Sequence, residues 1–113
     1  MHELGVVMEV VRTVEEFARD NDVESIETVV LQIGELSSMI PQYVKACYPA
    51  AVDGTLLEHA KLEVEILPAN ARCLDCGTVY NVLDQAGKCQ TCGSDRKELL
   101  SGKEFFIKEI VCY

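Results

Sequence analysis

Apolar side chains recur at intervals of three and four residues along the opening segment of the chain. This spacing places them on one face of a helix, and the stripe consists of Leu4, Val7, Met8, Val11, Val14, Phe17 and Ala18. Charged residues such as Glu9 and Arg12 take the opposite side, and the polar run at 20–22 ends the pattern. We therefore predict an amphipathic helix from Glu3 to Asp20.

Three further segments have the pattern of β-strands. Residues 26–33 are rich in β-branched side chains, and residues 61–67 alternate strictly between polar and apolar positions. Residues 104–111 return to the same character after a polar stretch. The positions expected to share a buried face are Val29, Leu31 and Ile33 in the first segment, and Phe105, Ile107 and Val111 in the last. All three segments are predicted to be strands.

A second helix is predicted between the first two strands. Pro41 suits the first turn of a helix, because its missing N–H has no helical partner there. The helix should run to Val52, where Asp53 and Gly54 close it. Pro49 lies inside this window, where it removes a backbone donor and is expected to kink or shorten the helix.

The segment from Cys73 to Cys92 differs in kind from the rest of the chain. It is made of cysteine, glycine and polar residues, with Val79, Val82 and Leu83 as its apolar filling. The predicted order is therefore helix, strand, helix, strand, cysteine module, strand. We interpret the module as an insertion between two strands of one α+β core.

Composition narrows the class of protein. The net charge of −9 argues against binding to nucleic acid or to an anionic membrane surface. The sequence has neither a signal peptide nor an apolar run long enough to cross a bilayer, so we expect a cytoplasmic protein. Thiols stay reduced in that compartment, so the six cysteines point to metal or redox chemistry instead of disulfides.

Two CxxC pairs carry the strongest chemical signal. Cys73 and Cys76 form the first pair, Cys89 and Cys92 the second, and a glycine follows each. Four thiolates suit a tetrahedral Zn²⁺ ion, and the glycines allow tight turns with N–H groups aimed at the sulfurs. A redox CxxC pair or an iron–sulfur cluster are the alternatives, but the duplication and the spacing favour zinc. Because protein would fill all four positions, the site is predicted to be structural.

The N-terminus offers a different set of ligands. The α-amine of Met1, the deprotonated amide of His2 and its Nδ1 atom can form a planar set of three nitrogens, which favours Ni²⁺ or Cu²⁺. Glu3 adds a carboxylate or simply favours the helix dipole. A histidine at this position is more often an ordinary terminal residue, so the residue pattern by itself leaves both interpretations open.

The remaining polar candidates are weaker. His59 is interpreted as a surface residue, Cys47 as core filling, and Cys112 as incidental. With two histidines in the chain, no catalytic triad can be assembled, and there is no glycine-rich phosphate loop. The closed zinc site leaves no open position for catalysis. The sequence therefore predicts a protein that is not an enzyme.

Several segments, taken in order, resemble the HypA family of nickel metallochaperones. They are Met1-His2-Glu3 opening an amphipathic helix, the 33–37 segment Ile-Gly-Glu-Leu-Ser, the 61–64 segment Lys-Leu-Glu-Val, and the 71–77 segment with its later partner at 89–92. The resemblance runs from one end of the chain to the other. It departs from some relatives after the Gly-Glu segment, where Met39, Ile40 and Pro41 offer no carboxylate.

This resemblance implies two helices on a small three-stranded mixed sheet, with a zinc-ribbon module inserted before the last strand. It implies a nickel-binding domain at 1–70 with 100–113 and a zinc domain at 71–99. His2 and the adjoining backbone would ligate nickel, with Met1 and Glu3 as possible further ligands. Cys73, Cys76, Cys89 and Cys92 would hold zinc.

The implied function is delivery of Ni²⁺ for maturation of [NiFe]-hydrogenase, and of urease in some members. The implied partners are a HypB-type GTPase and the hydrogenase large subunit, and we expect a monomer or a weak homodimer. The alternative is a zinc-ribbon adaptor that binds another protein and ignores nickel. An adaptor would tolerate a blocked N-terminus, whereas a nickel carrier would not.

Overall fold

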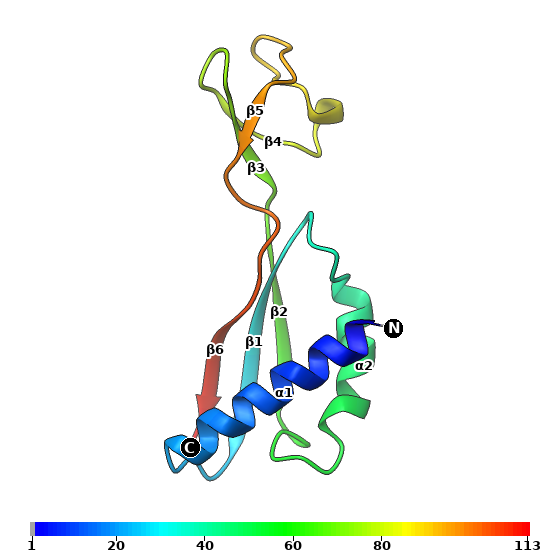
Figure 1. The fold of residues 1–113 in the computed structure, drawn as a ribbon, viewed down its shortest axis with the longest axis vertical. Helices are drawn as coiled ribbons and strands as arrows, with labels where there is room; N and C mark the ends of the chain where they lie inside the picture. The colour runs from blue at the N-terminus through cyan, green and yellow to red at the C-terminus, as the bar shows by residue number, and fades with distance from the viewer. Residues whose placement is uncertain (1) are drawn as a thin grey trace. The chain divides into compact units, whose positions relative to one another are not determined.

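The computed structural model describes residues 2–113, apart from the side chains of His2 and Gln85, and combines α-helices with two small sheets (Figure 1). The order along the chain is α1 (His2–Asp20), β1 (Ile26–Gly34), α2 (Pro41–Val52), β2 (Lys61–Leu67), β3 (Asn70–Cys73), β4 (Val79–Asn81), the 3₁₀ turn η1 (Gln85–Gly87), β5 (Lys97–Leu99) and β6 (Phe105–Cys112). The predicted α+β class and the predicted order of elements are confirmed.

The first sheet has the strand order β2-β1-β6 and is mixed. The N–H of Glu35 donates to the carbonyl of Leu67 at 2.9 Å, which joins the ends of β1 and β2 and makes them parallel. The N–H of Tyr113 donates to the carbonyl of Ser25 at 3.0 Å, so the end of β6 meets the start of β1 and these two strands are antiparallel. Helix α2 forms the crossover between the parallel strands, as parallel pairing requires.

The buried apolar side chains outside the cysteine module come mainly from α1, β1 and α2, and α1 packs against α2. Val29, Leu31 and Ile33 are 0–1% exposed, as their predicted face requires, and α1 contributes Val7, Val10, Val11, Val14 and Ala18. Met8 and Phe17 were expected in the helical stripe but are 54% and 39% exposed. The apolar stripe on α1 is therefore wider than the surface available to cover it.

Helix α2 runs to Val52, so Pro49 does not shorten it. The helix is fixed to the start of β2 by Tyr48, whose buried hydroxyl donates to the carbonyl of Ala60 at 3.0 Å. That burial raises the pKa of Tyr48. Among residues 2–113, no helix has both the length and the apolar character that crossing a membrane requires.

The second sheet has the order β4-β3-β5, with both pairs antiparallel. By backbone contacts the chain divides into two compact units. One consists of residues 1–32, 39–65 and 105–113, and the other of residues 33–38 and 66–104. We call the second the cysteine unit. The placement of nickel and zinc in separate domains stays a prediction.

The segment from Ile33 to Ser38 belongs to the cysteine unit, although its first two residues are also the last two of β1. Backbone hydrogen bonds hold it there, because the N–H of Leu36 donates to the carbonyl of Gly102 at 2.7 Å. The two backbone segments approach so closely that a Cβ atom on Gly34 would lie 2.0 Å from the carbonyl oxygen of Gly102. A larger residue at Gly34 would force these backbones apart.

Glu35 fastens the same segment through its side chain. One carboxylate oxygen accepts a hydrogen bond from the N–H of Ala69 at 2.7 Å and another from the Asn81 amide at 3.0 Å. The Asn81 bond and then the Ala69 bond lower the pKa of Glu35 below its ordinary value of 4.5. Both bonds favour the ionised carboxylate.

Glu35→Gln is therefore expected to lower the melting temperature of the protein at pH 7, relative to the exposed-residue control Glu63→Gln. Folding lowers the pKa of Glu35, so its contribution is complete above pH 4.5 and is lost as the pH falls through the lower pKa of the folded state. The difference in melting temperature should stay constant from pH 7 to about pH 5.5 and shrink below 4.5. Thermal unfolding followed by circular dichroism measures it; a difference that disappears near pH 6 would assign the effect to another group.

Candidate metal centre

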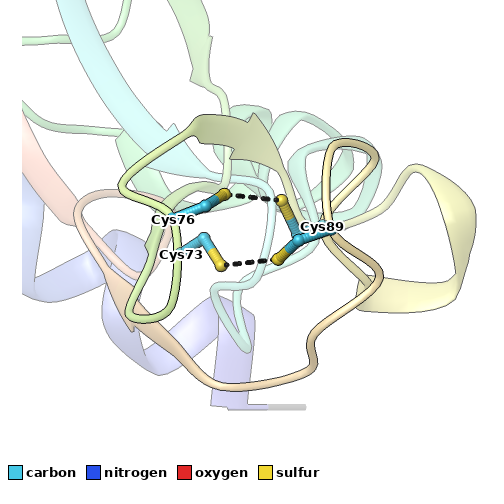
Figure 2. A group of neighbouring side chains, drawn as sticks. Cys73, Cys76 and Cys89 are labelled. Atoms are coloured by element: carbon cyan, nitrogen blue, oxygen red, sulfur yellow. Dashed lines mark hydrogen bonds between the residues drawn. The ribbon is translucent and has the colours of Figure 1, made fainter.

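The four cysteine side chains that the sequence paired come together in the cysteine unit. Their sulfur atoms all lie within 4.8 Å of one another. Among the described residues, these four cysteines are the group that could hold a metal ion. The Sγ atoms of Cys73 and Cys92 are 3.6 Å apart, and those of Cys76 and Cys89 are 3.5 Å apart. Figure 2 shows the Cys76 and Cys89 sulfurs facing each other.

Each pair sits on a turn of the same construction. In the first turn the N–H of Gly77 donates to the carbonyl of Cys73 at 2.9 Å, and in the second the N–H of Gly93 donates to that of Cys89 at 2.8 Å. Gly77 and Gly93 have φ values of +80° and +74°, a conformation that glycine adopts at no steric cost. The duplicated CxxCG sequence thus produces two matching turns, as predicted.

Backbone N–H groups in these turns point at sulfur and stabilise thiolate. The N–H of Cys76, with that of Asp75, lowers the pKa of Cys73. The N–H of Cys92, with that of Thr91, lowers the pKa of Cys89 to about 6 although burial opposes it. For Cys92 the N–H of Ser94 also lowers the pKa, but the neighbouring sulfurs and burial outweigh it and raise the pKa to about 12. Without a cation, the four groups cannot all ionise together.

The donor set fits a divalent metal ion with tetrahedral preference. Zn–S bonds of about 2.3 Å in a tetrahedron imply sulfur–sulfur distances of about 3.8 Å. The closest pairs, at 3.5 and 3.6 Å, are near that value. A bound cation would also offset the mutual repulsion of the thiolates and release their protons. The arrangement can therefore hold a metal ion through four protein ligands, with no position left open.

The apolar support of this centre differs from the sequence prediction. Val79 and Leu83 were expected to fill the module but are 53% and 55% exposed. Tyr80 is buried instead and packs with Cys73 and Cys89, with Val82 against them. In the three-residue strand β4, alternation turns Tyr80 inward and Val79 outward. The strand pattern was too short to reveal its register.

The N-terminal candidate is described only in part. Met1 and the His2 side chain lie outside the described part of the structure, although the His2 backbone begins α1. Glu3 is half-buried in the first turn of α1. It lines a pocket of about 330 Å³ together with Tyr43, Ala46 and Cys47. Cys47, interpreted as core filling, is half-buried at this pocket.

Of the two remaining candidates, neither joins the metal centre. The side chain of His59 is 94% exposed beside Glu58, as expected of a surface residue. Cys112 is half-buried near the end of β6. Sequence reasoning missed Asp75, Ser94 and Arg96, which connect the two cysteine turns. In the sequence, the only indication of these contacts is that Asp75 lies inside a CxxC pair.

Comparison with known proteins places the whole chain in one family. The family model described as "Hydrogenase/urease nickel incorporation, metallochaperone, hypA" matches residues 1–112. The chain belongs to the HypA family. The predicted family membership is thus confirmed, and with it the function of a nickel metallochaperone in hydrogenase or urease maturation. Members of this family are maturation factors and not enzymes, as the sequence predicted.

Curated HypA relatives match over nearly their full length. The hydrogenase maturation factor HypA of Moorella thermoacetica is 40% identical over 107 residues, covering 95% of each chain. That of Trichormus variabilis is 38% identical over 110 residues, covering 97% of this chain and 94% of the relative. The solution structure of the Ni metallochaperone HypA from Helicobacter pylori has a TM-score of 0.67 at 27% identity, covering 97% and 96% of the two chains. A second HypA solution structure has a TM-score of 0.72 at 28% identity, covering 100% and 97%.

Cys76→Ser is expected to weaken metal binding by the cysteine unit by at least 100-fold, because serine keeps the size of the side chain but not the thiolate. Cys112→Ser, which changes a thiol outside the cluster, should leave binding unchanged. Titration with Zn²⁺ against a chromogenic competitor measures both affinities. Equal affinities in the two variants would show that the cluster does not bind the ion as a four-sulfur site.

Proposed function

We propose that this chain captures one Ni²⁺ ion at its N-terminus and delivers it for hydrogenase maturation, while its four clustered cysteines hold a structural Zn²⁺ ion. The observation that carries the nickel function is the match of residues 1–112 to a family described by nickel incorporation. That match includes the Met1-His2-Glu3 segment. The Helicobacter pylori structure that resembles this chain is itself titled a Ni metallochaperone.

We assign nickel ligation to His2 and the adjoining backbone. His2 is the first residue of α1, and the first four N–H groups of a helix have no acceptor within it. Deprotonating the His2 amide therefore breaks no helical hydrogen bond. The amide, the Met1 α-amine and the His2 imidazole together supply three nitrogens in a plane, which suits Ni²⁺.

The fourth nickel position is assigned to Glu3, to water or to a residue of a partner. Glu3 is placed in the first turn of α1, close in sequence to the three nitrogens. An incompletely enclosed ion suits a carrier, because a recipient can exchange ligands at the open side. Affinity in the micromolar range, about −8 kcal/mol, would permit both capture and release. Such nitrogens bind Cu²⁺ more tightly than Ni²⁺, so copper must be kept scarce in the cell.

The zinc assignment rests on donor chemistry and geometry. Four thiolates within 4.8 Å of one another suit Zn²⁺, and four protein ligands close the site to substrate. We assign Zn²⁺ to Cys73, Cys76, Cys89 and Cys92, in a zinc domain at 71–99. Residues 1–70 with 100–113 would form the nickel-binding domain.

The family description names hydrogenase and urease as the endpoints of nickel incorporation. We propose a HypB-type GTPase and the hydrogenase large subunit as partners, with urease as a possible second client, and delivery in the cytoplasm. The net charge of −9 would favour partner surfaces that carry positive charge.

A nickel titration of untagged, zinc-loaded protein tests the terminal site. One equivalent of Ni²⁺ with the absorption band of a planar nitrogen complex is expected. His2→Ala should lose that band and at least 100-fold in affinity. His59→Ala, which removes the exposed histidine of the loop before β2, is the matched control and should bind as the wild type does.

An extension of a few residues before Met1 separates the carrier from the adaptor. The extension removes the free α-amine from its place beside His2, so nickel binding should weaken as in His2→Ala. If the extended protein and His2→Ala both bind one equivalent unchanged, the ligand assignment at the N-terminus is wrong. If none of the proteins binds Ni²⁺, the zinc-ribbon adaptor takes its place.

A further inference from the structure

Asp75 is the centre of a polar cluster between the two cysteine turns. It lies inside the first CxxC pair, while Ser94 and Arg96 follow the second. The Arg96 guanidinium donates to Asp75 Oδ1 at 2.7 Å, and the Ser94 hydroxyl donates to Asp75 Oδ2. The Ser94 hydroxyl oxygen also accepts from the N–H of Arg96 at 3.1 Å. Three residues thus form a closed set of hydrogen bonds across the two turns.

The same cluster is anchored to both turns through the backbone. The N–H of Leu74, beside Cys73, donates to the carbonyl of Arg96 at 3.1 Å. The N–H of Cys89 donates to the carbonyl of Ser94 at 2.9 Å. Asp75 therefore lies inside the first CxxC pair and contacts the residues after the second pair through its carboxylate.

We propose that Asp75, Ser94 and Arg96 form a clamp that holds the two cysteine turns together independently of the metal ion and thereby slows its release. The proposal rests on the four cysteines binding Zn²⁺, as proposed above. Asp75 is a positioning residue here and not a ligand, because its two carboxylate oxygens are occupied by Ser94 and Arg96.

The physical reason lies in how a four-sulfur site loses its ion. Metal leaves such a site in steps, and after the first bonds break one turn must swing away before the rest follow. While the clamp holds, a detached sulfur stays close to the ion and rebinds it, which is an effective-concentration effect. The clamp therefore acts mainly on the rate of dissociation, and less on thermal stability.

The size of the effect follows from exposure. The side chains of Asp75 and Arg96 are 39% and 66% exposed, so water and salt weaken their attraction. A single exposed ion pair changes an equilibrium by about fivefold at most. Because Ser94 shares the Asp75 carboxylate, we expect removal of the clamp to speed metal release by about five- to tenfold.

The same unit contains a matched ion pair that does not connect the turns. Arg72 donates to Glu98 at 2.8 Å, and the two side chains are 51% and 56% exposed. These residues are opposite each other on β3 and β5. Glu98→Ala thus removes a carboxylate–arginine pair of similar length and exposure from the same unit, and leaves the contact between the turns intact.

The test measures release of Zn²⁺ from full-length protein to a chromogenic chelator, at chelator concentrations where the rate no longer depends on chelator. Asp75→Ala, which removes both contacts of the carboxylate, is expected to release the ion about five- to tenfold faster than the wild type. Arg96→Ala leaves the hydrogen bond between Ser94 and Asp75 in place and is expected to speed release by up to about fivefold. The double variant should be no faster than the faster single variant, because the two side chains act as one unit. Glu98→Ala should keep the wild-type rate. Arg96→Ala gives the same test if Asp75→Ala fails to fold.

Co²⁺ in place of zinc supplies a spectroscopic check. At saturation the thiolate-to-cobalt absorption of Asp75→Ala should equal that of the wild type, because all four sulfurs still bind. Loss of intensity would mean that Asp75 shapes the ligand set instead of retaining the ion, and would overturn the proposal. Wild-type release rates in Asp75→Ala and Arg96→Ala, or equal acceleration in Glu98→Ala, would also overturn it. If wild-type protein shows no thiolate absorption with Co²⁺, the zinc assignment itself fails.

Discussion

Four ionisable thiols converge in a unit that has little apolar material to hold them together. The buried cluster around them consists of Cys73, Tyr80 and Cys89, with Val82 packed against it. Small units of this kind usually need a metal or disulfides to compensate for a small core. The backbone N–H of Cys92 is the main cause that lowers the pKa of Cys89 to about 6. For Cys92 the N–H of Ser94 lowers the pKa, but the neighbouring sulfurs and burial outweigh it and raise the pKa to about 12, so the sulfurs resist ionising together. A divalent cation held by the four sulfurs would offset the repulsion among the thiolates and stabilise the cysteine unit.

Outside the cysteine module, buried aliphatic side chains hold the fold together. The core of α1 and β1 is built from close-packed aliphatic side chains, with Val14, Val29 and Ile33 fully buried. In the function proposed above, nitrogen donors at the N-terminus and soft sulfur donors in the cysteine unit would select different metals. A carrier can therefore keep one ion permanently and exchange another.

The sequence predicted helices and strands well where the pattern of apolar residues extends over many positions. Bounds of α2 and β2 match the prediction because prolines mark them at Pro41 and Pro68, and the cysteine cluster followed from two CxxC pairs. Prediction from the sequence failed where the position of a side chain depends on contacts between residues distant in the chain. Met8 belongs to the helical stripe but is exposed, and the spacing of apolar residues does not show which members of a stripe a neighbouring element covers. Tyr80 was missed because three residues do not reveal a register. The contact of Asp75 with Arg96 joins turns that no periodicity connects.

In the proposed function, two ions occupy two separate ligand sets. X-ray absorption at the zinc and nickel edges, on untagged protein loaded with one equivalent of each, tests it most directly. We expect a zinc ion surrounded by four sulfurs at about 2.3 Å, and a nickel ion surrounded by nitrogen and oxygen alone. Sulfur in the nickel shell, or a zinc shell that loses sulfur when nickel is added, would show that the two ions compete for the cysteines and would contradict the account.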